Sequence, residues 1–82
     1  MLYTVSVSNC KNPHIECKYE GLGLFLALSV AEILGEAFRS IEVMNEETGE
    51  LVYHCYYSDE VFLHRRTEGQ AIERANYAIA SH

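Results

Sequence analysis

The chain has 82 residues, of which 49% are hydrophobic and 22% charged, and its formal net charge at pH 7 is −6. These values indicate a single folded domain over residues 1–82 and exclude a disordered chain. Six carboxylates and no lysine or arginine lie between Glu42 and Glu60. This stretch argues against direct nucleic-acid binding, which needs cations to neutralise phosphates, and suits a basic protein partner better.

The N-terminus and the apolar runs predict where the chain resides. The first ten residues, MLYTVSVSNC, lack the basic start and the cleavage site of a secretory signal. The longest uncharged run, residues 21–31, is shorter than the roughly 20 residues that a membrane-spanning helix needs. We therefore expect a cytoplasmic protein without a membrane span, whose three cysteines stay reduced.

The first 20 residues predict a β-hairpin. Tyr3, Val5 and Val7 alternate with polar residues over residues 2–8, which is the period of a half-buried strand. A similar alternation covers residues 15–20, after the turn signal Asn12-Pro13. We expect these two strands to pair with each other.

Residues 10–17, CKNPHIEC, raise the possibility of a metal site. Cys10, His14 and Cys17 are ligand types that zinc uses, and His54-Cys55 could complete a tetrahedral set. The spacing differs from the close ligand pairs of regular structural zinc sites. A hairpin tip with ordinary cysteines is the favoured interpretation, and a metal- or thiol-binding protein stays open as an alternative.

The register of the hairpin bears on that choice. A loop of residues 12–14 pairs Val7 with Tyr19 and Asn9 with Cys17, which puts the apolar residues of both strands on one face. Cys10 then faces away from Cys17. We therefore expect Cys17 to pack inward with Tyr19, Cys10 and His14 to be exposed at the tip, and no metal or other cofactor.

The stretch GLGLFLALSVAEILGEAFR, residues 21–39, predicts one long helix. Its polar residues Ser29, Glu32, Glu36 and Arg39 recur three and four positions apart, as one helix face requires. Residues 22–28 are apolar all round, so this helix needs cover on more than one side or from another subunit. Its two leading glycines do not complete a phosphate-binding fingerprint, because Leu26 stands where the third glycine would be.

A second hairpin is expected from strands over residues 40–44 and 51–57, which flank the turn NEETGE. Gly49 supplies the positive φ that such a loop needs. Bulky residues on both alternating faces of 51–57 predict a strand covered on two sides. His54 and Cys55 are neighbours on this strand and point to opposite faces, so they cannot act together as a catalytic base and nucleophile.

The C-terminal residues predict an amphipathic helix over 68–80. Thr67 and Gln70 have the spacing of a capping box. The apolar stripe behind them consists of Ala71, Ile72, Ala75, Ala78 and Ile79. Because most of these are alanines, we expect the helix to lie close to its partner and to cover only part of the surplus apolar surface.

The second hairpin carries a resemblance. The segment from Ile41 to Tyr53 has the form EV-x-x-x-E-T-G-E-x-V-Y. It resembles small uncharacterised accessory proteins of bacteria, their mobile elements and their phages. The resemblance implies the order strand, helix, hairpin and brings no activity, cofactor or site residue.

Together these patterns predict an α+β fold of order β-β-α-β-β-α, with an antiparallel sheet packing the long helix on one face. We expect a non-catalytic protein-interaction module, not an enzyme, that assembles as a homodimer. The expected interaction residues are Leu22, Phe25, Leu26, Tyr53, Tyr56 and Tyr57. An acidic regulator of nucleic-acid machinery that offers its hairpin to a basic protein stays open as an alternative.

Overall fold

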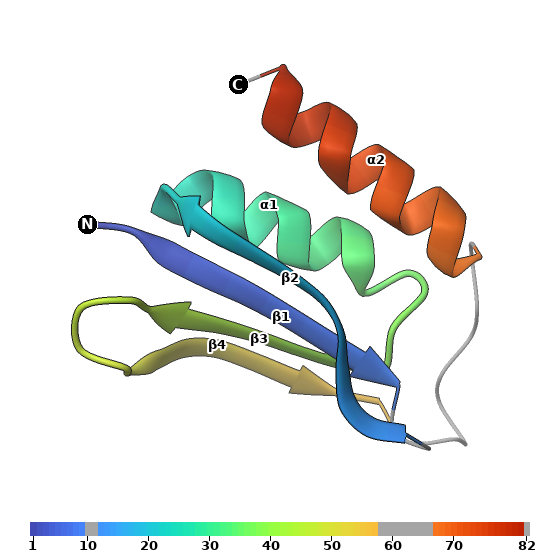
Figure 1. The fold of residues 1–82 in the computed structure, drawn as a ribbon, viewed down its shortest axis with the longest axis horizontal. Helices are drawn as coiled ribbons and strands as arrows, with labels where there is room; N and C mark the ends of the chain where they lie inside the picture. Colours follow the sequence, from blue (N-terminus) through green and yellow to red (C-terminus); the bar gives the residue numbers. More distant parts are fainter. Residues whose placement is uncertain (10–11, 58–66, 82) are drawn as a thin grey trace.

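The computed structural model of the chain describes residues 1–9, 12–57 and 67–81, with the backbone alone at residues 9 and 12–16. Its elements are β1 (Tyr3–Asn9), β2 (Asn12–Leu22), α1 (Leu24–Leu34), β3 (Ser40–Asn45), β4 (Leu51–Tyr56) and α2 (Glu68–Ala80) (Figure 1). This order confirms the predicted α+β class.

The strands form one antiparallel four-stranded sheet in the order β2-β1-β3-β4. The two central strands supply the buried face, where Val5, Val7, Ile41 and Val43 have almost no solvent exposure. Helix α1 packs on this face. Alternating apolar residues on β1 and β3 thus create a single hydrophobic face that one amphipathic helix can cover.

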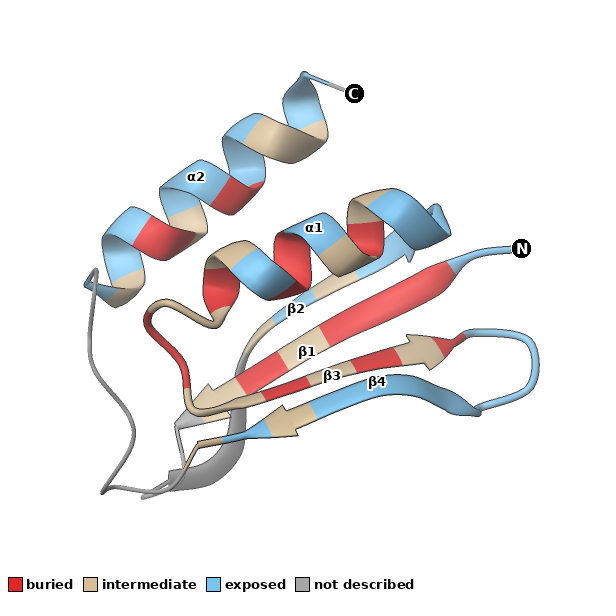
Figure 2. Ribbon diagram, turned by 180° about the vertical axis from the view of Figure 1, so that it is seen from behind, coloured by how far each residue is buried: buried red, intermediate tan, exposed pale blue. Residues whose placement is uncertain are grey.

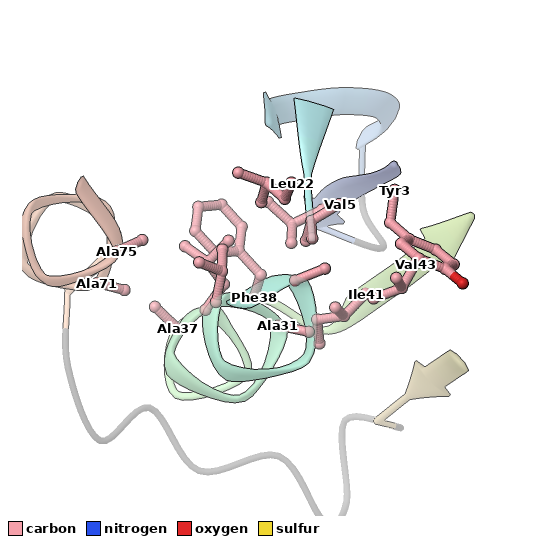
Figure 3. Close-up of a cluster of buried hydrophobic side chains, with 14 residues drawn as sticks. Tyr3, Val5, Leu22, Ala31, Ala37, Phe38, Ile41, Val43, Ala71 and Ala75 are labelled. Carbon is pink, nitrogen blue, oxygen red and sulfur yellow. The ribbon is translucent and has the colours of Figure 1, made fainter. Parts of the chain in front are cut away.

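Helix α2 packs against α1 (Figure 1). Ala71 and Ala75 of α2 are fully buried and point toward the end of α1, where Ala37 and Phe38 lie (Figure 3). Small side chains let the two helices approach closely. The predicted second cover for α1 is therefore present, and α2 supplies it.

The start of α2 matches its prediction in detail. The Thr67 hydroxyl accepts a hydrogen bond from the Gln70 N–H at 3.1 Å, and the Gln70 side chain accepts one from the Thr67 N–H at 3.0 Å. This capping box satisfies two backbone groups that a helix start otherwise leaves without partners. The predicted span of residues 68–80 is confirmed.

The predicted register of the first hairpin is wrong by two residues. Val7 pairs with Cys17 and Val5 with Tyr19, and β2 already begins at Asn12, inside the predicted loop. The shift is even, so the predicted face is correct: Cys17 and Tyr19 pack against the core. Asn12-Pro13 was misread as a turn because an edge strand such as β2 can accommodate a proline.

The predicted extent of the first helix is also wrong. Helix α1 covers 11 residues and ends before Gly35, whereas the polar stripe predicted a helix to residue 39. After Gly35 the chain forms a tight turn, in which the Ala37 N–H donates a hydrogen bond to the Leu34 carbonyl at 3.0 Å. Ala37 and Phe38 stay buried after the helix ends, because positions three and four after Leu34 lie on the side that α1 turns to the core. Gly35, a poor helix former, stands at the C-cap, where the helix ends.

The predicted cover of the second hairpin is wrong as well. The turn itself is as expected, with Gly49 at φ +74°. Strand β4, however, is exposed along almost its whole length (Figure 2). Because α1 lies between α2 and β4 in Figures 1 and 3, α2 does not reach this strand. No described helix is long and apolar enough to cross a membrane.

Candidate functional site

The structure separates the six expected interaction residues into two groups. Three of them belong to the interior: Leu22 is 6% exposed, and Leu26 and Tyr57 pack half-buried against the core. Three are exposed: Phe25 by 82%, Tyr53 by 38% and Tyr56 by 56%. Phe25 stands in the first turn of α1, and the two tyrosines lie on β4. Among the described elements, β4 therefore carries the most exposed large apolar side chains, whereas α1 carries Leu24 and Phe25.

Strand β4 reads LVYHCY and contains no charged residue, glycine or proline. Its exposed large apolar side chains are Leu51, Val52, Tyr53 and Tyr56. It forms one edge of the sheet and pairs with β3 alone among the described strands. Proteins usually protect such edges with charges, prolines or bulges, because an unprotected edge pairs readily with another strand.

The backbone of β4 presents hydrogen-bonding groups to this edge. The Tyr57 N–H donates to the Arg39 carbonyl at 2.9 Å, and the β3–β4 register is unbroken from there back to Tyr53. Along an antiparallel ladder, hydrogen-bonded residues alternate with residues whose backbone groups point away. Cys55 and Tyr53 therefore face β3, and the N–H and C=O of His54 point to the outer edge.

The opposite edge of the sheet is protected. Strand β2 carries Pro13, and its exposed residues Lys18 and Glu20 alternate with the half-buried residues that face the core. Its end is distorted by a bulge at Gly21, where φ is +72°. The two edges thus differ in their protection: β4 has no charged residue and no proline, and its one irregularity lies near its start, between Leu51 and Tyr53.

The two faces of β4 have different surroundings. Cys55 pairs with Ile41 on the face that α1 covers, whereas His54 pairs with Glu42 on the outer face. Burial raises the pKa of Tyr53, and a hydrogen bond from its hydroxyl to the Cys55 sulfur and the charges of Cys55 and Glu32 raise it further. The prediction that His54 and Cys55 point to opposite faces is confirmed, so the two cannot act as a catalytic pair.

The structure also bears on the possible metal site. Cys10 and the side chain of His14 lie outside the described residues, so the exposure predicted for them stays a prediction. His54 and Cys55 lie on β4, which is three strand spacings, or about 14 Å, from Cys17 on β2. They cannot complete a site there. The described residues hold no cluster of three or more metal-ligating side chains.

Glu46 makes a set of contacts that the sequence did not reveal. One of its carboxylate oxygens accepts hydrogen bonds from the Gly21 N–H at 2.7 Å and from the Thr4 hydroxyl at 2.9 Å. The first of these bonds, then the second, lower the pKa of Glu46, and Lys18 adds to this effect. Glu46 thus ties the β3–β4 turn to β1 and β2, and occupies the glycine N–H that a phosphate ligand would have used.

This contact also changes the view of the acidic stretch. Glu46, Glu47 and Glu50 are all exposed at the described turn, and the hydrogen bonds of Glu46 use one of its two carboxylate oxygens. Asp59 and Glu60 lie outside the described residues. The described turn thus presents three of the six carboxylates counted in the sequence, one of them partly engaged within the chain.

An open depression of about 600 Å³ lies between α1 and α2. Its lining residues are Ile33, Gln70, Glu73, Arg74, Tyr77 and Ala78. The Arg74 guanidinium, which could attract an anionic ligand, is 2.6 Å from a carboxylate oxygen of Glu36. This ion pair connects α2 to the turn that follows α1 and leaves the depression without a free arginine among its described lining residues.

Comparison of the chain with protein-family models, with curated proteins and with solved structures finds no match. The resemblance carried by residues 41–53 therefore stays a prediction. The assignment of a function rests on β4 and its surroundings.

Proposed function

We propose that this chain is a non-catalytic protein-interaction module of the cytoplasm that assembles as a homodimer. The observation that carries the proposal is the edge strand β4, which has no Asp, Glu, Lys or Arg, is exposed, and has β3 as its one neighbour among the described strands. The backbone groups of His54 at this edge need partners, and a strand of a second molecule supplies them with the right spacing.

A second copy is favoured over a basic partner because of the chemistry of the strand. Recognition of a basic protein needs carboxylates, and β4 has none between Leu51 and Tyr56. An uncharged strand meets an identical strand without placing like charges opposite each other. Closed two-fold pairing also removes the exposed edge from both molecules, which explains why neither needs a protective charge there.

Sedimentation velocity of the untagged protein over a range of concentrations tests this proposal. We expect a reversible dimer whose fraction grows as the protein concentration rises, with no catalytic cofactor bound. The salt dependence identifies the type of contact. Each copy carries a net charge of −6, so added salt should screen the repulsion between copies and strengthen the dimer.

A protein that remains monomeric at every concentration would refute the homodimer. An acidic regulator predicts the opposite salt effect, because its binding to a basic protein weakens as salt rises. The alternative of a metal-binding protein predicts bound zinc in native mass spectrometry, which resolves the mass of the metal directly.

A further inference from the structure

We infer that two copies join through β4 in antiparallel fashion, with His54 opposite His54 of the second copy, so that their sheets form one continuous eight-stranded sheet. The inference rests on the proposed homodimer and specifies its contact and register. It uses the one sheet edge that has exposed apolar side chains and no protective charge among the described strands.

Symmetry limits the possible registers. A two-fold axis that pairs β4 with itself in antiparallel fashion must stand perpendicular to the sheet, and it keeps α1 on the same face in both copies. Residues that face each other across the axis then share a face. One residue of β4 must therefore lie opposite its own copy, and the central candidates are Tyr53, His54 and Cys55.

Backbone direction selects among these three. A pair that exchanges two hydrogen bonds on the axis needs outward N–H and C=O groups, which His54 has and its two neighbours do not. A centre at Tyr53 would pair His54 with Val52, where the ladder is irregular. A centre at Cys55 would set Val52 and Leu51 opposite positions 58 and 59, which lie outside the described residues. The geometry therefore favours His54.

The side chains fit this register. On the face that α1 covers, Tyr53 lies opposite Cys55 of the second copy. On the outer face, the His54 imidazoles lie side by side with Glu42 on the far side of each. Because β4 contains no Asp, Glu, Lys or Arg, no pair within the strand brings two of these charges together. A contact confined to edge strands is small, so we expect a dissociation constant in the micromolar range.

Disulfide cross-linking tests the register. The probe chain carries His54→Cys together with Cys10→Ser, Cys17→Ser and Cys55→Ser, which leaves one thiol per copy. Opposite residues of a hydrogen-bonded pair have Cα atoms about 5.5 Å apart, which a disulfide spans. Copper(II) phenanthroline accepts the two electrons, the two thiols release their protons, and the new S–S bond joins the copies. We expect covalent dimer as the main product.

The matched control keeps the native thiol of Cys55 and carries only Cys10→Ser and Cys17→Ser. In the proposed register Cys55 and its copy are diagonal neighbours about 7–8 Å apart, which exceeds the reach of a disulfide. This control should stay mostly monomeric on a denaturing gel. Efficient cross-linking through Cys55 instead of position 54 would overturn the register.

A second measurement needs no cysteine replacement. His54→Lys places two ammonium groups opposite each other and should weaken the dimer at least about tenfold in sedimentation. Tyr77→Lys adds the same charge at an exposed position of α2 and serves as the control, which should keep the affinity of the parent. Equal affinities of the two variants would overturn the β4 contact.

These results also separate the inference from the proposal on which it rests. A parent protein that dimerises while the His54 probe does not cross-link and His54→Lys has no effect would refute the β4 pairing and leave the homodimer standing. A parent protein that is monomeric throughout would refute both.

Discussion

The Glu46 side chain connects three elements of the described fold. Its carboxylate accepts hydrogen bonds from Gly21 at the end of β2 and from Thr4 on β1, although it belongs to the turn after β3. Hydrogen bonds from an amide and a hydroxyl favour the ionised form over the protonated one. The folded state therefore gains stability from this carboxylate only while it is ionised.

The consequence is a defined dependence on pH. The pKa of Glu46 is lowered in the folded protein, so its contribution is complete above the ordinary pKa of a glutamate and is lost as the pH falls through the lowered value. Glu46→Gln should lower the free energy of unfolding in urea at pH 7. The difference from the parent should shrink as the pH falls below about 4.

Glu47→Gln is the control for this prediction, since it makes the same chemical change on the next, exposed side chain of the turn. Its effect on urea unfolding at pH 7 should be small. Equal effects of the two substitutions would show that the general acidity of the turn, and not the contact with Gly21, determines the pH dependence.

Gly21, whose N–H donates to the Glu46 carboxylate, is the other residue on which these contacts depend. Its φ of +72° lies in the left-handed region, which costs a residue with a Cβ atom about 1–2 kcal/mol. Nothing lies within 4 Å of the position that a Cβ would occupy, so the cost comes from the backbone and not from a clash.

Gly21→Ala should therefore lower the free energy of unfolding by about 1 kcal/mol in urea denaturation. Gly21→Asn should cost less, because asparagine tolerates the left-handed region better than alanine does. The prediction fails if alanine is accepted as well as asparagine.

At the scale of elements, α2 depends on its capping box. Thr67→Ala removes the side-chain acceptor for the Gln70 N–H and should cost about 1 kcal/mol of unfolding free energy. Thr67→Ser keeps the hydroxyl and should be close to neutral. Thermal unfolding followed by circular dichroism measures both, and a neutral Thr67→Ala would mean that packing of Ala71 and Ala75 alone holds the helix.

The elements also differ in how far the sequence predicts them. The α2 prediction was accurate because a capping box and an apolar stripe are local signals. The length of α1 was overestimated because the polar stripe continues past Gly35, the C-cap residue at which the helix ends. The hairpin loop at Asn12-Pro13 was misplaced for another reason: only the position of β2 at the sheet edge makes a proline acceptable in the strand.

The candidate site, like the fold, could be predicted only in part from the sequence. The excess of apolar residues in 51–57 is visible in the sequence, and so is the opposition of His54 and Cys55. Whether that strand lies inside the sheet or at its edge is set by the strand order, which no local pattern reveals. The sequence therefore predicted cover for β4, and the structure shows an exposed edge. The Glu46 contacts were missed because they join residues 25 and 42 positions apart.

At the scale of the whole molecule, the account centres on one asymmetry of the sheet. The β2 edge is protected by charge, proline and a bulge, whereas the β4 edge is apolar and exposed. The core of each copy is complete without a second copy, since its largest side chains, among them Phe38, Leu34 and Ile41, are fully buried. The dimer would therefore form between folded monomers and dissociate without unfolding them.

Amide hydrogen exchange at His54, followed by NMR at low and high protein concentration, tests this account most directly. In the monomer the Cys55 N–H is bonded to β3 and the His54 N–H points outward, so exchange should be slow at Cys55 and fast at His54. At concentrations where the dimer dominates, exchange at His54 should slow and become comparable with that at Cys55. Fast exchange at His54 in a solution shown to be dimeric would contradict strand pairing through β4.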